Sequence, residues 1–490
     1  MSVAFNDVPN SIKVPFLYAE FDNTAAQSGP NQQPYRVIII GPKLAAGVAV
    51  DDSLTLISSN ASEANGLFGD GSILAESVKA FREVNSFNEL YALSVSDDGG
   101  SVAAAGTLEI LTPPTASGTM AFYIAGKVYS IAVVNGATEA AIVTDLIAEI
   151  QADTSRLVDA VVNGVNADLI DFTARNKGIT GNDIDFRFNY GSDDETPAGV
   201  TSTIVAMAGG TGQPDLSSAI AALDDKQYIL LVCPFNDSAN RAVIEAELGN
   251  RFGPLQQIDG YCHYYKKDSF ANLVTFGTGL NSQFSIMHRA QQVDHGAIQI
   301  SRKVAVITRA GEIDPARPFQ NLEVTGNLAE ADSERLSLED RNTLLSNGIA
   351  TDKILSGKVI LERVITTYQT NNAGASDTSY GDLNTLLTLS FLRYDWRNYM
   401  LGKYPRHKLA DDGSRFSEGQ PIMTPGLGKA EAIKKFREWE FNGLVEGADQ
   451  FKEDLIVERN VSDVNRLDFM LPTDLVNQLR VMGVQFKFLL

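Results

Sequence analysis

The side chains best suited to catalysis or metal binding are four histidines and two cysteines in a chain of 490 residues. The histidines are His263, His288, His295 and His407, and no two of them have the spacing of metal ligands on one helix. Cys262 precedes His263, which suggests a nucleophile beside its base. Neighbouring strand residues point to opposite faces, so we expect these two side chains to diverge. The sequence therefore predicts no catalytic pair and no metal site.

Two glycine-containing segments resemble parts of ligand-binding loops. Residues 209–212 (GGTG) resemble a phosphate-binding loop, but its lysine is missing and Pro214 follows where a helix with free N–H groups is needed. Residues 411–413 (DDG) match a fragment of a calcium loop without the alternating acidic ligands and the closing glutamate. We interpret both as ordinary turns, and we expect no bound cofactor.

Composition and charge limit the kinds of partner. With 44% hydrophobic and 21% charged residues the chain is typical of a globular protein, and its length predicts several domains. A net charge of −21 repels phosphate backbones, so nucleic acid is a poor partner for the surface as a whole. No apolar run is long enough to cross a bilayer, and we expect no direct membrane insertion.

The cellular compartment follows from the N-terminus and the cysteines. No basic region precedes an apolar segment at the start of the chain, which argues against a secretory signal. Cys233 and Cys262 each lie in an apolar run, and this is typical of buried thiols in a reducing compartment.

The elements that must position these residues alternate between strands and helices. This alternation predicts a mostly parallel sheet covered on both faces, in a discontinuous α/β core domain over residues 34–97 and 214–295. We expect strands at 36–40, 89–95, 227–233, 258–264 and 284–288, and helices at 72–84, 238–252 and 269–276.

Residues 98–213 differ in character and are bounded by turn-forming clusters. Residues 119–126 and 127–134 alternate and meet at a Gly-Lys pair, which predicts a hairpin, and residues 140–150 predict a helix. Further strands are expected near 157–162, 184–190 and 201–208. We interpret this segment as an inserted α+β domain that faces solvent.

Residues 296–483 are expected to form a C-terminal α+β domain. Ser337 and Asp340 predict a helix start that resembles a capping box. We expect a strand pair or one long strand at 298–308 and a long strand at 357–368. Helices are expected at 383–400, 429–440 and 473–482, and a hairpin made by 454–458 and 466–471.

One helix in this acidic chain is basic, through Lys434, Lys435 and Arg437. It is interpreted either as a solvated helix face or as a patch that docks an acidic partner surface.

Both ends of the chain have strand patterns without an evident sheet. A lone strand leaves its backbone N–H and C=O groups unpaired, and pairing with another copy of the chain would satisfy them. The alternative is that each end folds back on its own domain. We expect an N-terminal arm at 1–33 and a C-terminal arm at 484–490, with the interface residues Val14, Phe16, Tyr18, Val484, Phe486, Phe488 and Leu490.

Blocks spread along the whole chain resemble the contractile tail sheath proteins of Mu-like phages. Their order makes the resemblance specific, although each block is weak alone. The blocks are 8–20 (VPNSIKVPFLYAE), 35–41 (YRVIIIG), 181–184 (GNDI), 207–216 (MAGGTGQPDL), 344–349 (LLSNGI), 365–371 (ITTYQTN), 403–413 (KYPRHKLADDG) and 451–459 (FKEDLIVER).

The resemblance implies a structural role without an active site. Sheath subunits stack as hexameric rings around a tail tube, and their terminal arms complete a small sheet on neighbouring subunits. The sheath then shortens and drives the tube through a host envelope. Implied partners are further copies of the chain, the tail tube protein, and the baseplate and tail terminator proteins. The implied location is the virion tail, after assembly in the host cytoplasm.

The expected fold class is therefore a multidomain α/β fold: a mostly parallel α/β core with an inserted α+β domain and extended N- and C-terminal strand arms. The core and C-terminal domains would form the layer against the tube, and the basic helix would contact it. Two other classes of function stay open: a ring-forming assembly protein that does not contract, and a nucleotide-binding α/β enzyme.

Overall fold

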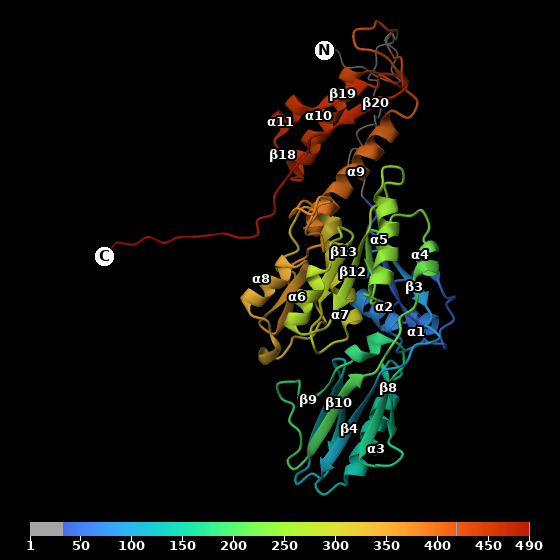
Figure 1. Ribbon diagram of the computed structural model, residues 1–490, viewed down its shortest axis with the longest axis vertical. Coiled ribbons are helices and arrows are strands. Elements are labelled where there is room, and N and C mark those ends of the chain that lie inside the picture. The colour runs from blue at the N-terminus through green and yellow to red at the C-terminus, as the bar shows by residue number, and fades with distance from the viewer. Residues whose placement is uncertain (1–32, 418, 490) are drawn as a thin grey trace, which may run out of the picture.

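The computed structural model describes residues 33–417 and 419–489. The molecule is elongated, and three parts follow one another along its long axis (Figure 1). A main body lies in the middle, the segment that follows β3 lies at one end, and a smaller subdomain that precedes the C-terminus lies at the other. We call this last part the upper subdomain (residues 404–475).

The main body contains an eight-stranded sheet in the order β15-β14-β13-β12-β11-β1-β3-β2. Every pairing from β3 to β14 is parallel, and only the edge strands β2 and β15 pair in antiparallel fashion. The strands are β1 (Val37–Pro42), β2 (Ser53–Ile57), β3 (Leu90–Val95), β11 (Leu230–Val232), β12 (Tyr261–Lys266), β13 (Ser285–Arg289), β14 (Ile349–Leu355) and β15 (Lys358–Arg363). The expected largely parallel main sheet is thus confirmed.

Helices cover both faces of this sheet, so its central strands are buried throughout. Val37 and Ile39 of β1 pack into one core, whereas Ile38 and Ile40 pack into the other. The first face is covered by α2 (Ile73–Val84), α7 (Gly296–Ile313) and the start of α9 (Leu383–Lys403). The second is covered by α4 (Ser217–Ala221), α5 (Ser238–Phe252), α6 (Phe270–Thr278) and α8 (Leu338–Ser346).

Local capping signals act as the sequence indicates. Ser72 precedes α2, and its side chain accepts a hydrogen bond from the backbone N–H of Ala75 at 3.0 Å. Ser337 and Asp340 form the reciprocal capping box of α8. Both caps satisfy backbone donors that the first helical turn leaves free.

The segment after β3 forms two further sheets with one helix and a core of its own. The sheets have the orders β10-β4-β8-β7 and β6-β5-β9, and β5 and β6 form the expected hairpin. Elements are β4 (Ala105–Thr112), β5 (Gly118–Ile124), β6 (Lys127–Val133), α3 (Glu139–Ala152), β7 (Val158–Val162), β8 (Leu169–Ala174), η1 (Ile179–Asp183), β9 (Phe186–Phe188) and β10 (Thr201–Ala208). The short helix α1 (Glu63–Phe68) lies in the main body, between β2 and α2.

The long helix α9 leads from the main body into the upper subdomain (Figure 1). There α10 (Pro425–Phe441) packs on α11 (Ala448–Asp454) and on a two-stranded ribbon, around a small aromatic core. The strands are β16 (Lys408–Leu409), β17 (Ile422–Met423), β18 (Val445–Glu446), β19 (Ile456–Arg459), β20 (Leu467–Met470) and β21 (Asp474–Leu475), and η2 (Asp332–Glu334) precedes α8.

Two predicted elements are wrong. Residues 298–308 are not a strand but belong to α7, because Ile300, Val304 and Ile307 pack on the main sheet with helical spacing. Residues 473–482 are not a helix; they are extended, since β21 pairs with β18 instead. The large sheet also takes β14 and β15 from beyond residue 296, where the sequence suggested a new domain.

Candidate functional site

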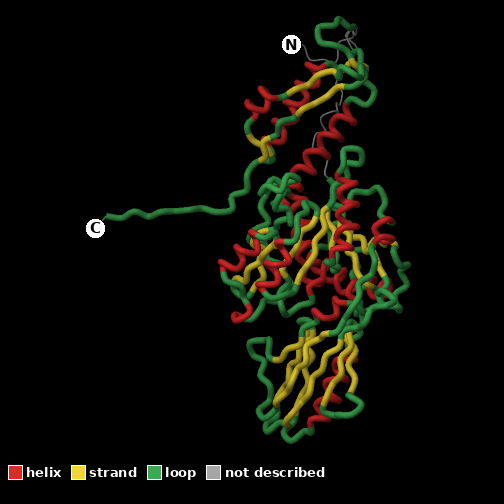
Figure 2. Tube along the Cα trace, in the orientation of Figure 1, coloured by secondary structure: helices red, strands yellow, loops and turns green. Residues whose placement is uncertain are grey.

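The C-terminal segment leaves the body as an extended chain (Figure 2). We call residues 481–489 the tail. The sequence-predicted residues Val484, Phe486 and Phe488 are 74%, 88% and 80% exposed. Apolar side chains exposed in a row are typical of a surface that another molecule covers. Leu490 and the N-terminal candidates Val14, Phe16 and Tyr18 lie outside the described residues.

The ribbon made by β19 and β20 has the geometry of a strand acceptor. Among the described residues, no third strand pairs with either of its edges. The backbone N–H of Asn460 donates to the carbonyl of Arg466, and hydrogen-bonded pairs alternate along an antiparallel ribbon. The backbone groups of Val457 and Arg459 therefore face the open edge of β19. This edge can pair with an added strand.

The basic helix is α10, and its three candidate residues do not share one surface. Lys434 and Arg437 are exposed, but Lys435 is almost completely buried. Its ammonium lies 2.8 Å from Asp395 on α9 and 3.0 Å from Glu438. The expectation of a three-residue basic patch is thus corrected to a two-residue patch, because Lys435 neutralises a buried carboxylate.

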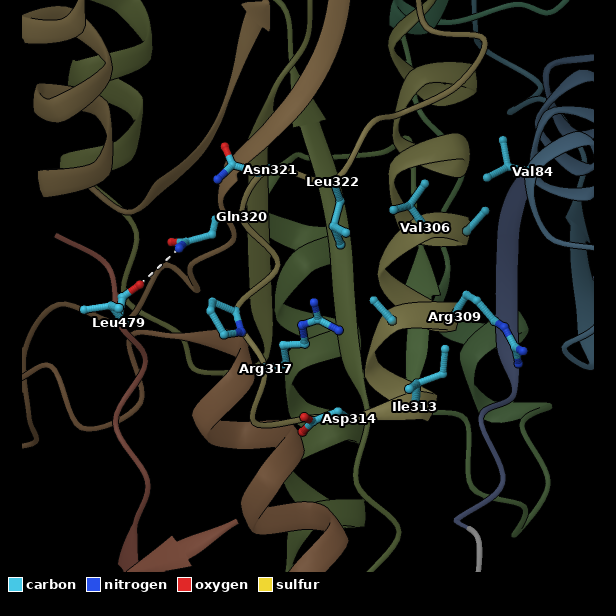
Figure 3. Close-up of a pocket in the computed structure, with 13 residues that line it drawn as sticks. Val84, Val306, Arg309, Ile313, Asp314, Arg317, Gln320, Asn321, Leu322 and Leu479 are labelled. Carbon is cyan, nitrogen blue, oxygen red and sulfur yellow. Dashed lines mark hydrogen bonds between the residues drawn. The ribbon is translucent and has the colours of Figure 1, made fainter. Parts of the chain in front are cut away.

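A largely apolar groove of about 780 Å³ lies beside the base of the tail (Figure 3). Its floor comes from the outer side of α7, including Val306 and Ile313, and its far wall is Leu479. The hydrogen bond between Gln320 and the Leu479 carbonyl closes one side.

The buried histidines belong to the packed core. Nδ1 of His263 and Nε2 of His288 lie 2.9 Å apart on neighbouring strands. Burial lowers the pKa of His263 to about 3, and burial together with His263 and Lys303 lowers the pKa of His288. Cys262 points to the opposite face, into the core with Cys233. The predicted divergence of Cys262 and His263 is therefore confirmed.

The two loop candidates belong to connecting segments. Residues 209–212 lie where the chain returns to the main body, and Thr211 pairs there with Val102 in an isolated antiparallel bridge. Asp412 and Gly413 lie in a turn. The Asp412 carboxylate accepts the backbone N–H of Gly426. Within residues 33–417 and 419–489, no group of three or more acidic, histidine or cysteine side chains is arranged to hold a metal ion. Across the same ranges, no helix has the length and apolarity to span a bilayer.

Comparison with known proteins places the chain in a family. The model of the phage tail sheath protein central domain matches residues 209–367, and that of the phage tail sheath C-terminal domain matches residues 375–488. The Mu-like prophage FluMu tail sheath protein of Haemophilus influenzae is 39% identical over 494 aligned positions, which cover 100% of both chains. The chain belongs to the phage tail sheath family.

Solved sheath structures are also similar to this sheath subunit. The sheath tail protein of Desulfitobacterium hafniense has a TM-score of 0.49 at 13% identity, over 95% of this chain and 97% of that chain. The Listeria innocua sheath tail protein has a TM-score of 0.46 at 13% identity, over 92% and 94%. The contracted helical sheath of the anti-feeding prophage has a TM-score of 0.47 at 11% identity, over 97% and 99%.

Membership of the family decides the broad role. The sheath subunit is a structural protein of a contractile phage tail and not an enzyme, so the alternative of a nucleotide-binding α/β enzyme is set aside. A sheath is a polymer, so the subunit assembles with other copies of itself in the virion tail.

Proposed function

We propose that the sheath subunit polymerises around the tail tube by exchanging strands between copies and that the polymer contracts to drive the tube through a host envelope. The observation that carries this proposal is the exposed, extended tail with its row of apolar side chains. The open edge of β19 on another copy supplies the backbone partners that the tail lacks.

The energies of such an exchange are sufficient for a stable polymer. Each backbone hydrogen bond contributes roughly 0.5–1.5 kcal/mol net. Burial of Phe486 and of Phe488 contributes roughly 1.5–3 kcal/mol each. Ordering the tail costs part of this gain, and several kcal/mol per subunit remain. A covalently tethered strand keeps copies connected while rigid bodies move past each other.

The proposal also covers the partners and the arrangement of the domains. The subunits stack as hexameric rings, and the proposed partners are the tail tube protein and the baseplate and tail terminator proteins. Assembly takes place in the host cytoplasm. The N-terminal arm (1–33) and the C-terminal arm (484–490) connect copies. The layer against the tube is formed by the core domain (34–97 and 214–295) and the C-terminal domain (296–483), whereas the inserted segment 98–213 faces outward. Lys434 and Arg437 of α10 are the proposed tube contacts.

Removal of residues 484–490 tests the proposal. We expect the truncated subunit to stay soluble and to form no cylinders by electron microscopy. The matched control changes Gln485 and Lys487 to Ala, which leaves the apolar row intact and should preserve assembly. Long cylinders from the truncated protein would show that the tail does not connect copies. Paired images of extended and shortened particles separate contraction from a static ring assembly.

A further inference from the structure

The base of the tail is held to the main body by two neighbouring residues. The carbonyl of Leu479 accepts a hydrogen bond from the side-chain amide of Gln320 at 3.0 Å (Figure 3). Nη2 of Arg480 lies 3.0 Å from Oδ1 of Asp382 and 3.2 Å from Oδ1 of Asn384. We call these contacts the clamp. The apolar side chains that follow are exposed, so the clamp marks the point where the tail leaves the body.

The clamp is fixed to the main sheet rather than to the upper subdomain. Asp382 immediately precedes α9, and Arg363 at the end of β15 binds both of its carboxylate oxygens, at 3.0 and 2.7 Å. Asp382 also forms a bridge with Ile365. A rotation of the upper subdomain would therefore leave the exit point of the tail in place.

Without the clamp, the last contact that holds the chain before the tail would lie in the upper subdomain. There β21 pairs with β18, and the backbone N–H of Val476 donates to Leu444. The free chain would then comprise residues 477–489 in place of 481–489. It would also start from a different part of the subunit.

The Arg480 contact is poorly suited to stabilise the isolated subunit. Its Nε and Nη1 atoms are buried without a hydrogen-bond partner among the described residues. A buried donor that loses water and gains no partner opposes the stability of its contact. The Arg480 contact therefore restricts the direction in which the tail leaves more than it stabilises the subunit.

We propose that Arg480 is the positioning residue of strand exchange, which fixes where and in which direction the tail leaves so that it meets the acceptor edge of a second copy. This inference rests on the proposed function. An extended chain spans about 3.3 Å per residue, so the tail reaches about 30 Å from Arg480. Effective concentration falls as about the −3/2 power of free length, so the longer release alone lowers it about twofold. Loss of direction lowers it further.

Replacement of Arg480 by Ala in the full-length chain tests this role. We expect the concentration needed for polymerisation, followed by light scattering and electron microscopy, to rise, and to rise at least about twofold when Q320A is added so that the whole clamp is released. The melting temperature of the monomer below that concentration should stay unchanged, and hydrogen exchange at residues 477–480 should become faster. R480K keeps a cation near Asp382 and should restore much of the assembly.

Matched variants make each outcome decisive. Arg415 is an exposed arginine of the upper subdomain outside the β19/β20 ribbon, and R415A should polymerise like the unchanged protein. If R480A releases residues 477–480 but polymerises at the same concentration, the proposal is wrong. If R480A fails to fold, Arg480 has a structural role. The clamp is then tested by Q320A, which removes the hydrogen bond to Leu479. An unchanged polymerisation concentration for Q320A would show that the clamp does not position the tail. The proposed strand exchange is tested separately. It would be contradicted if the subunit without residues 484–490 still assembled.

Discussion

Lys435 of α10 and Asp395 of α9 form a buried ion pair with 2.8 Å between Nζ and Oδ2, and each side chain is at most 4% exposed. The indole N–H of Trp439 donates to the same carboxylate oxygen at 2.7 Å. This pair therefore joins α10 of the upper subdomain to α9, the helix that leads there from the main body. A basic residue that looks like part of a surface patch holds the upper subdomain on α9.

Replacement of Lys435 by Ala should strongly destabilise the upper subdomain. It leaves the Asp395 charge buried without a cation, and the loss of one partner of a buried pair costs about 3–5 kcal/mol in unfolding free energy. The only two tryptophans of the chain, Trp396 and Trp439, lie in contact here, so denaturant unfolding followed by tryptophan fluorescence reports on this part. The neighbouring control K434A should change the free energy by less than about 0.5 kcal/mol. Equal stability of K435A and K434A would contradict the assigned role.

Reversal of Lys434 and Arg437 to Glu should weaken binding to the tail tube without unfolding the subunit. Both side chains are exposed, so the fluorescence transition should not move. Co-sedimentation with purified tubes should decrease, and the binding of the unchanged protein should itself weaken as salt rises. The same charge reversal at Lys127 and Lys177, on the segment proposed to face outward, is the control. Unchanged tube binding would make α10 a solvated face.

Acid should destabilise the main body through its buried histidines. Burial lowers the pKa of His263 to about 3 and that of His295 to about 4, and His288 is lowered in the same direction. Their pKa values in the unfolded chain are near 6.5, so below that pH the unfolded state binds more protons. The contribution of these neutral histidines to the stability of the folded state is complete above about pH 6.5 and is lost as pH falls. Each group contributes up to about 1.4 kcal/mol per pH unit.

A buried carboxyl acts in the opposite direction. Burial raises the pKa of Asp294 to about 6, so its protonation favours the folded state as pH falls below that value. The double variant H263Q/H288Q isolates the histidine contribution: its melting temperature should fall less between pH 7 and pH 5. The exposed His407 provides the control H407Q, which should keep the original slope. Identical slopes in all three proteins would exclude the buried pair as the cause.

Local pattern was sufficient for most of the main body. The strands near residues 36–40 and 89–95 and the helix after Ser72 lie where the sequence predicts them, because apolar runs, period and caps act over a few residues. Cys262 and His263 diverge for an equally local reason, the alternation of side chains along a strand. The alternation of apolar and polar residues also predicts the row of apolar side chains in the tail.

Longer-range contacts decided what the pattern missed. The β-branched residues of 298–308 favour a strand in isolation, but packing between α2 and the main sheet makes them a helix. Residues 473–482 have helical spacing, yet β18 and the clamp at Arg480 hold them extended. Burial of Lys435 required Asp395 from another helix, and no local signal reports such a partner. Sequence by itself determined most of the elements and the family. The tertiary structure decided the remaining elements, which charged side chains lie on the surface and where the tail leaves, because burial depends on residues far apart in the chain.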